Sequence, residues 1–210
     1  MKRILLFSNI LVLIFLTGCI SSSPGKKYFQ LHIDDIPRGN QEQTEVEEPD
    51  KIILVEIAKV EDVYNDYRIV YRTSPYQLNY YSYNFWIKRP GKIIRDAMYT
   101  YLLKANIFKK VILHLAEGEP DYLLKTKVDV LEEYDLKRVW YAHLKMEIEI
   151  KDFKSGKTII FYRFDKRKRL SERRVERVPV AISAILKEEL AAVSAQFLAK
   201  IGQQTGSDMP

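Results

Sequence analysis

The clearest pattern in the chain is a strict alternation of apolar and other positions over residues 140–151. A two-residue period of this kind is typical of a strand that buries one face. The apolar positions are Trp140, Ala142, Leu144, Met146, Ile148 and Ile150. Ser155-Gly156 then predicts a turn into a further strand over residues 157–169, so that the two strands form a long hairpin exposed on one face.

Two other segments have the apolar spacing of helices. Residues 90–105 start at Pro90, repeat apolar residues at i, i+3 and i+4, and are followed by Asn106, which tolerates the left-handed conformation that ends helices. Residues 179–201 carry a single apolar stripe. Its members are Ile182, Leu186, Leu190, Val193, Phe197 and Ile201. Each segment predicts an amphipathic helix with one face on a core.

Shorter apolar runs predict strands at residues 27–33, 51–60, 108–115 and 121–134. Between residues 63 and 86 lie nine aromatic side chains, in two strand-like runs separated by Thr73-Ser74-Pro75. We expect a hairpin that is covered on both faces. Its rings either fill the core alone or also contact a partner or second subunit. The candidates for that contact are Tyr71, Tyr76, Tyr80, Tyr81 and Trp86.

These elements predict an α+β fold, a two-layer sandwich in which a mostly antiparallel sheet carries two amphipathic helices on one face. One folded domain is expected over residues 27–202. It includes a polar loop at residues 34–50, with seven carboxylates against the single Arg38. Residues 203–210 are expected to form a disordered tail.

The amino-terminal segment predicts export and lipidation. Lys2 and Arg3 precede a mostly apolar stretch at residues 4–16, which is shorter than the roughly 18 residues needed to cross a bilayer. Leu16-Thr17-Gly18-Cys19 then reads as a lipoprotein processing site. We expect residues 1–18 to be a signal peptide cleaved between Gly18 and Cys19, with acyl chains on Cys19 that anchor the protein in a membrane. The alternative is an uncleaved signal anchor in which Cys19 is an ordinary apolar residue.

Residues 19–26 are expected to be a flexible tether between the lipid and the domain. Ile20 stands where bacterial lipoproteins kept in the inner membrane commonly have Asp. In a Gram-negative cell this favours the inner leaflet of the outer membrane, facing the periplasm.

Charge alone indicates no particular partner. Loss of residues 1–18 removes Lys2 and Arg3, so the net charge falls from +6 to +4. Residues 163–177 hold eight cations against three carboxylates. This run either is the solvent-exposed end of a strand and the segment that precedes the last helix, or it contacts anionic lipid or an acidic partner. The candidates for such a contact are Arg167, Lys168, Arg169 and Arg173. No nucleic-acid partner is expected for an exported lipoprotein.

Candidate chemistry is sparse. His32, His114 and His143 fall on three predicted strands, which predicts no metal site, and no cofactor motif is present. Glu132 and Glu133 are adjacent on a predicted strand and therefore face opposite sides, which suits a sheet edge better than an acid/base pair. We expect no enzyme. The rival hypothesis, an anchored hydrolase, would depend on His143 or Ser74.

The aromatic segment also carries a family signal. Residues 68–78, then Tyr80-Tyr81, Tyr83, Trp86 and Pro90, followed by a helix and residues 108–111, resemble the ABC-type transport auxiliary lipoproteins, which include the paraquat-inducible protein C group. The similarity is clearest over residues 51–111. Ile87-Lys88-Arg89 departs from the small or acidic residues expected after the Trp.

The resemblance implies a non-catalytic accessory lipoprotein, a docking or scaffold subunit of an ABC-type intermembrane lipid transport system. Its partner would be a mammalian-cell-entry-domain protein of that transporter, and self-association into a homo-oligomer is compatible with the role. The alternative is a structural lipoprotein that supports assembly of an outer-membrane protein or a polysaccharide-export complex.

Overall fold

A computed structural model of the chain describes residues 25–34, 36, 50–136 and 139–207. The elements in chain order are β1 (Lys27–Phe29), β2 (Ile52–Val55), β3 (Lys59–Val60), η1 (Asp62–Tyr64), β4 (Arg68–Ser74), β5 (Gln77–Trp86), α2 (Pro90–Ala105), β6 (Lys110–Ile112), η2 (Leu115–Glu117), β7 (Tyr122–Leu136), β8 (Val139–Asp152), β9 (Thr158–Arg169) and α3 (Arg177–Ser207). The expected signal peptide, Cys19, residues 37–49 of the acidic loop and residues 208–210 lie outside the described residues.

The long strand β7 organises the sheet. Along one edge it pairs with β8 in an antiparallel ladder, and β8 pairs in the same way with β9. Along its other edge β7 pairs in turn with the short strands β2, β3 and β4, all of them parallel to it. Further out, β6 lies beside β2. On the other side β5 lies beside β4, and β1 lies beside β5. The prediction of a mostly antiparallel sheet is confirmed by the long ladders between β7, β8 and β9. The short pairings of β7 with β2, β3 and β4 are parallel.

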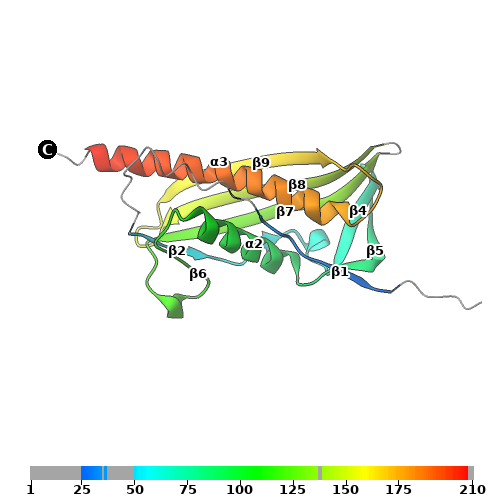
Figure 1. Ribbon diagram of the computed structural model, residues 1–210, viewed down its shortest axis with the longest axis horizontal. Coiled ribbons are helices and arrows are strands. Elements are labelled where there is room, and N and C mark those ends of the chain that lie inside the picture. Colours follow the sequence, from blue (N-terminus) through cyan, green and yellow to red (C-terminus); the bar gives the residue numbers. More distant parts are fainter. Residues whose placement is uncertain (1–24, 35, 37–49, 137–138, 208–210) are drawn as a thin grey trace, which may run out of the picture.

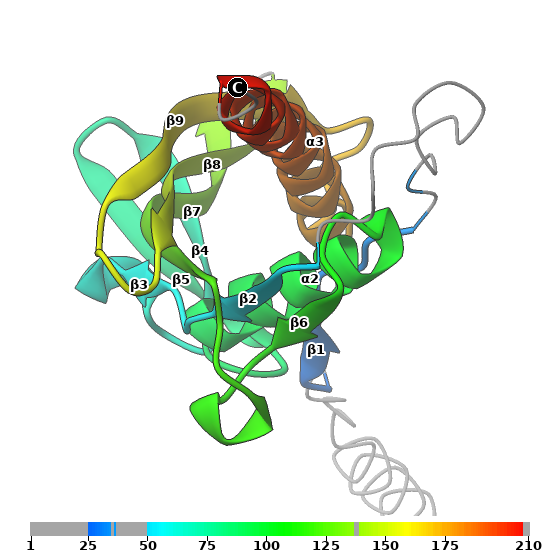
Figure 2. The same ribbon diagram turned by 90° about the vertical axis from the view of Figure 1, so that its left-hand side faces the viewer.

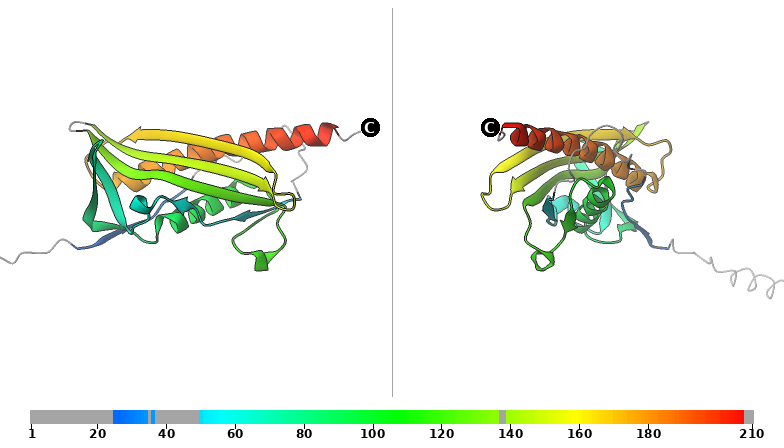
Figure 3. Two further views of the ribbon diagram at one scale, coloured as in Figure 1. Left: turned by 180° about the vertical axis from the view of Figure 1, so that it is seen from behind. Right: turned by 60° about the vertical axis from the view of Figure 1, so that its left-hand side comes forward.

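Both helices pack on the concave face of the curled sheet, as the apolar stripes predict. Figure 2, viewed along the long axis, shows α2 and α3 closing the open side of the curl. Figure 3 shows the opposite, convex face of β7, β8 and β9, which neither α2 nor α3 covers. The α+β fold class with two helices on one sheet face is therefore confirmed.

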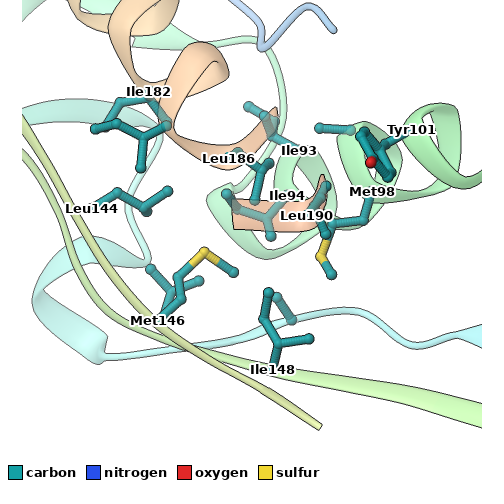
Figure 4. Close-up of a cluster of buried hydrophobic side chains, with 14 of the residues drawn as sticks. Ile93, Ile94, Met98, Tyr101, Leu144, Met146, Ile148, Ile182, Leu186 and Leu190 are labelled. Carbon is teal, nitrogen blue, oxygen red and sulfur yellow. The ribbon is translucent and has the colours of Figure 1, made fainter. Parts of the chain in front are cut away.

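The core lies between these two layers. Ile93, Ile94, Met98 and Tyr101 of α2 meet Ile182, Leu186 and Leu190 of α3 above Leu144, Met146 and Ile148 of β8, and all of these side chains are buried (Figure 4). Each Leu or Ile buried in this way contributes about 1.5–3 kcal/mol to folding. The regular alternation of β8 and the two helical stripes thus supply most of the core.

Helix α2 begins and ends where its sequence predicts. Pro90 occupies the first turn, and Asn106 adopts the left-handed conformation with φ 53° and ψ 41°. Other boundaries differ from the prediction. The strand expected over residues 51–60 is divided into β2 and β3, and α3 continues to Ser207, so the tail expected from residue 203 is helical for five more residues.

The domain is elongated, with the start of the described chain at one end and the last turns of α3 at the other (Figure 1). β1, the β4–β5 hairpin and the start of α3 lie at the first end. The turn between β8 and β9 lies at the opposite end, where Gly156 takes a positive φ of 69°.

Candidate functional site

The aromatic segment forms the β4–β5 hairpin that closes one end of the sheet. Ile69 and Val70 are neighbours on β4 and therefore point to opposite faces, yet both are buried. The hairpin is thus covered on both faces. Its register shifts between Arg68, which pairs with Phe85, and Val70, which pairs with Tyr80, so β5 carries extra residues there.

The five aromatic residues predicted to contact a partner have different surroundings. Tyr71 and Tyr81 pack against each other with ring centroids 4.7 Å apart. The Tyr80 hydroxyl donates to the Val63 carbonyl over 3.0 Å. Tyr76 stands at the hairpin turn with 98% of its surface exposed. Trp86 is only 2% exposed and belongs to the core, so we remove it from the predicted contact.

Two buried carboxylates of β7, those of Glu132 and Glu133, hold this hairpin. On the convex face, Glu132 accepts hydrogen bonds from Arg72 Nε and Tyr64 Oη, each at 2.8 Å. The His143 ring lies 3.4 Å from Glu132 through Nδ1 and 2.7 Å from Asp165 through Nε2. Burial alone would raise the pKa of Glu132, but the hydrogen bonds from His143, Arg72 and Tyr64 outweigh it and lower that pKa.

The second carboxylate, Glu133, faces the other way. Its Oε2 accepts a hydrogen bond from Tyr81 Oη at 2.8 Å, and Asp135 and Arg173 form an ion pair beside it. Burial raises the pKa of Glu133, because Tyr81 and Arg173 compensate only part of the lost hydration and Asp135 adds a like charge. The neighbouring glutamates therefore have pKa values shifted in opposite directions.

The expectation that Glu132 and Glu133 belong to a sheet edge is wrong. They lie on β7, which has strands on both sides, and the prediction that they face opposite sides holds. A signal was present in the sequence, because one of two adjacent carboxylates on a strand must face the core side and needs a partner there if that face is buried.

The basic residues proposed for anionic contact do not form one surface. Lys168 faces α3 and pairs with Glu188, and Arg173 pairs with Asp135. Arg167 lies over the Tyr134 ring at 5.0 Å, on the convex face. Arg169 is exposed opposite Tyr141 on β8. The pairing pattern of β9 separates these cations, since alternate residues of a strand point to opposite faces.

The two residues named for a hydrolase, His143 and Ser74, have separate hydrogen-bond partners. The two ring nitrogens of His143 contact the carboxylates of Glu132 and Asp165, and Ser74 Oγ accepts a hydrogen bond from the backbone N–H of Tyr76. Within the described part of the chain, no three His, Asp or Glu side chains are grouped as metal ligands. Neither described helix has the length and apolar composition of a membrane span.

Comparison with solved structures shows the fold. Protein XCC0632 from Xanthomonas campestris, a member of family DUF330, aligns with a TM-score of 0.70 and 15% sequence identity, over 86% of this chain and 99% of its own. The two folds are alike. A second, uncharacterized protein aligns with a TM-score of 0.66 and 15% identity, over 82% of this chain and 99% of its own. No family model matches the chain, and no curated protein matches its sequence.

Proposed function

We propose that the protein is a membrane-anchored, non-catalytic accessory lipoprotein that serves as a docking or scaffold subunit of an ABC-type intermembrane lipid transport system. Acylated Cys19 is its anchor, and the domain faces the periplasm from the outer membrane. Its partner is a mammalian-cell-entry-domain protein of the transporter.

One observation carries this proposal. The residues by which the chain resembles the ABC-type auxiliary lipoproteins form a single unit: residues 68–78 make β4 and its turn, the following aromatic residues lie on β5, and Pro90 begins α2. This unit closes the end of the domain at which β1 begins, directly after the tether (Figure 1). The fold shared with XCC0632 supports one auxiliary domain of this kind.

Tyr76 is the side chain in this unit that is best placed to meet a partner. Tyr71, Tyr80 and Tyr81 are partly buried and hold the hairpin together, whereas Tyr76 is exposed at its turn. Exposed tyrosines are favoured at protein interfaces because they offer a large rigid ring with one polar atom. We therefore centre the partner contact on Tyr76.

Affinity capture of the full lipidated protein from membranes tests the proposal. Wild-type protein should retain permease, ATPase and cell-entry-domain subunits, and Tyr76→Ser should lower that retention by about fivefold or more, as expected for loss of an interface anchor. Phe161→Ser is the matched control, because Phe161 is an exposed aromatic on β9. Its retention should equal that of the wild type.

Retention of none of these subunits by the wild type would contradict the proposal. Copurification with an outer-membrane β-barrel instead would favour a structural assembly role. The anchor is tested separately by mass spectrometry of Cys19, where an unmodified thiol would contradict lipidation.

A further inference from the structure

The surface beside the start of α2 contains a hollow of about 430 Å³. Its lining combines cations with exposed apolar groups from the loop before β4, the connection between β5 and α2, and the first turns of α2. The lining residues are Tyr67, Ile87, Lys88, Arg89, Lys92 and Arg95. A second hollow of about 230 Å³ adjoins it and shares Ile87 and Lys88. We call the larger one the cationic hollow.

The cationic hollow carries an excess of positive charge. Of its four cations, Lys88 and Arg95 both pair with Asp96, at 2.7 Å and 3.0 Å. Arg89 donates to the Asn65 carbonyl over 2.8 Å and lies over the Tyr67 ring. No carboxylate of the described chain is within ion-pair distance of Arg89 or Lys92. Asp96 is the one carboxylate of the described chain that forms an ion pair with any of these four cations, and the charge of Arg89 also acts on Asp66, whose own ion pair is with Arg68. The hollow therefore keeps an excess of positive charge, and Arg89 and Lys92 can bind an external anion.

The rim of the hollow is apolar and exposed. Ile87 is 53% exposed and Tyr67 46% exposed. On the same side of the domain, exposed Tyr28 stacks on Phe85 with ring centroids 5.7 Å apart. Aromatic and apolar side chains beside Lys and Arg are the composition of surfaces that contact the headgroup layer of a bilayer, where rings enter the interface and cations meet phosphates.

The hollow also lies close to β1, the first strand after the expected tether. Ile87 at its rim donates its backbone N–H to the Phe29 carbonyl over 2.8 Å, at the end of β1. Cys19 precedes Gly25, the first described residue, by six positions, so an anchor on Cys19 is at most about 20 Å from Gly25 along an extended chain. A bilayer that holds the acyl chains is therefore within reach of this end of the domain.

We propose that the cationic hollow binds the phosphate of an anionic phospholipid headgroup in the membrane that carries the acyl anchor, and thereby orients the domain on that membrane. The inference rests on the anchored role proposed above.

Vesicle flotation of the Cys19→Ser mature chain tests the proposal without the acyl anchor. This chain should bind vesicles of phosphatidylcholine with 30 mol% phosphatidylglycerol and should not bind vesicles of phosphatidylcholine alone. Adding Arg89→Gln and Lys92→Gln should weaken binding by about 30-fold, since each cation near an anionic surface contributes about 1 kcal/mol, a factor of about five. Circular dichroism should show unchanged folding.

The matched control removes two exposed cations, Lys154 and Lys157, in the turn between β8 and β9 at the other end of the domain (Figure 3). Lys154→Gln with Lys157→Gln makes the same change in net charge and should alter binding less than twofold. Equal losses in both double variants would overturn the proposal, because net charge alone would then explain binding. Absence of vesicle binding by the parent chain would also overturn it.

Inorganic phosphate is the second probe. At constant ionic strength it should displace the protein from vesicles only weakly, because the apolar rim contributes to membrane binding. Saturable calorimetric binding of free phosphate without any vesicle binding would overturn the assignment to a lipid headgroup. If the hollow does not bind vesicles, lipidation of Cys19 and capture of transporter subunits are still expected. The two proposals can therefore fail separately.

Discussion

Replacing each of the two adjacent buried glutamates by glutamine should affect stability differently, with a loss for Glu132 and no loss or a small gain for Glu133. Glu132 and Glu133 are both 2% exposed, and each side chain accepts a tyrosine hydroxyl. Only Glu132 also binds a guanidinium group directly, through Arg72. Glutamine keeps the shape and one acceptor oxygen but removes the charge. The pair Glu132→Gln and Glu133→Gln therefore separates the effect of charge from the effect of shape.

Glu132→Gln should destabilise the protein by about 2 kcal/mol. Removing one partner of a buried ion pair costs about 3–5 kcal/mol, because the other charge stays buried and unpaired. The Arg72 side chain is 19% exposed, so water recovers part of that loss. The amide oxygen of glutamine can still accept one of the bonds from Arg72 or Tyr64, which reduces the cost further.

Glu133→Gln should leave stability unchanged at pH 7 or raise it by up to about 1 kcal/mol. Burial raises the pKa of Glu133, which means that the folded environment disfavours its charged form. A neutral amide removes that unfavourable charge and keeps an oxygen for the Tyr81 hydroxyl.

The two effects should also depend on pH in opposite ways. The folded-state pKa of Glu132 lies below its ordinary value of 4.5, so its contribution is present above pH 4.5 and is lost as pH falls through the folded-state value. The folded-state pKa of Glu133 lies above 4.5, so stability falls as pH rises from 4.5 through that value. The gain from Glu133→Gln should therefore vanish below pH 4.5.

Urea unfolding of the mature chain at pH 7 and pH 4, followed by circular dichroism, measures both effects. With a slope of about 2 kcal/mol per molar urea, Glu132→Gln should lower the midpoint by about 1 M at pH 7 and by less at pH 4. The Glu133→Gln midpoint should equal or exceed that of the wild type. Equal losses in the two variants at pH 7 would refute the reasoning, because the opposite pKa shifts would then have no energetic consequence.

Three further substitutions have outcomes that urea unfolding can check. Gly91→Ala should cost about 2 kcal/mol, because an added Cβ would lie 2.5 Å from the Ala58 carbonyl oxygen, and an unchanged midpoint would contradict this close approach. Thr126→Val should stabilise by about 1 kcal/mol, since the buried Thr126 hydroxyl has no hydrogen-bond partner among the described residues; a loss of stability would reveal one. Phe197→Ala should cost about 3–5 kcal/mol, because Phe197 is fully buried, and a loss below 1 kcal/mol would place that ring outside the core.

The parts of the fold with a regular apolar period were predictable from the sequence. The alternation over residues 140–151 matches β8, and the stripes of residues 90–105 and 179–201 match the buried faces of α2 and α3. In each case one face is buried along most of the element, up to Phe197 in α3, so the apolar pattern is continuous over that length. Parallel pairing of β2, β3 and β4 with β7 was not predictable, because these strands are short and carry no register signal of their own.

The partners of the two glutamates were missed because β7 changes phase within the strand. Val128 pairs with Met146, but Val130 pairs with Lys145, so a bulge at Asp129 shifts the register by one residue. A regular two-residue period would place Val130 on the face of Val128, but the bulge turns Val130 away, and Leu131 takes the buried position. The alternation of apolar and polar residues over 121–134 does not reveal the bulge, because the sequence does not mark Asp129 as an extra residue.

The bulge explains how the aromatic hairpin is fixed to the domain. The ladder between β4 and β7 consists of two residue pairs, Tyr71 with Glu133 and Arg72 with Tyr134, which is too short to hold a hairpin by backbone hydrogen bonds alone. After the bulge, Glu132 bonds Arg72 on the convex face and Glu133 bonds Tyr81 on the concave face.

The two carboxylates therefore clamp the hairpin to the central strand from both sides. Such side-chain bonds are strong where they are shielded from water, and they set the angle at which the hairpin turn and Tyr76 project. Loss of Glu132 should consequently release β4 and β5 before the rest of the sheet. Amide hydrogen exchange in Glu132→Gln should accelerate on the hairpin while β8 stays protected, and uniform acceleration across the sheet would show that the hairpin is held by the core instead.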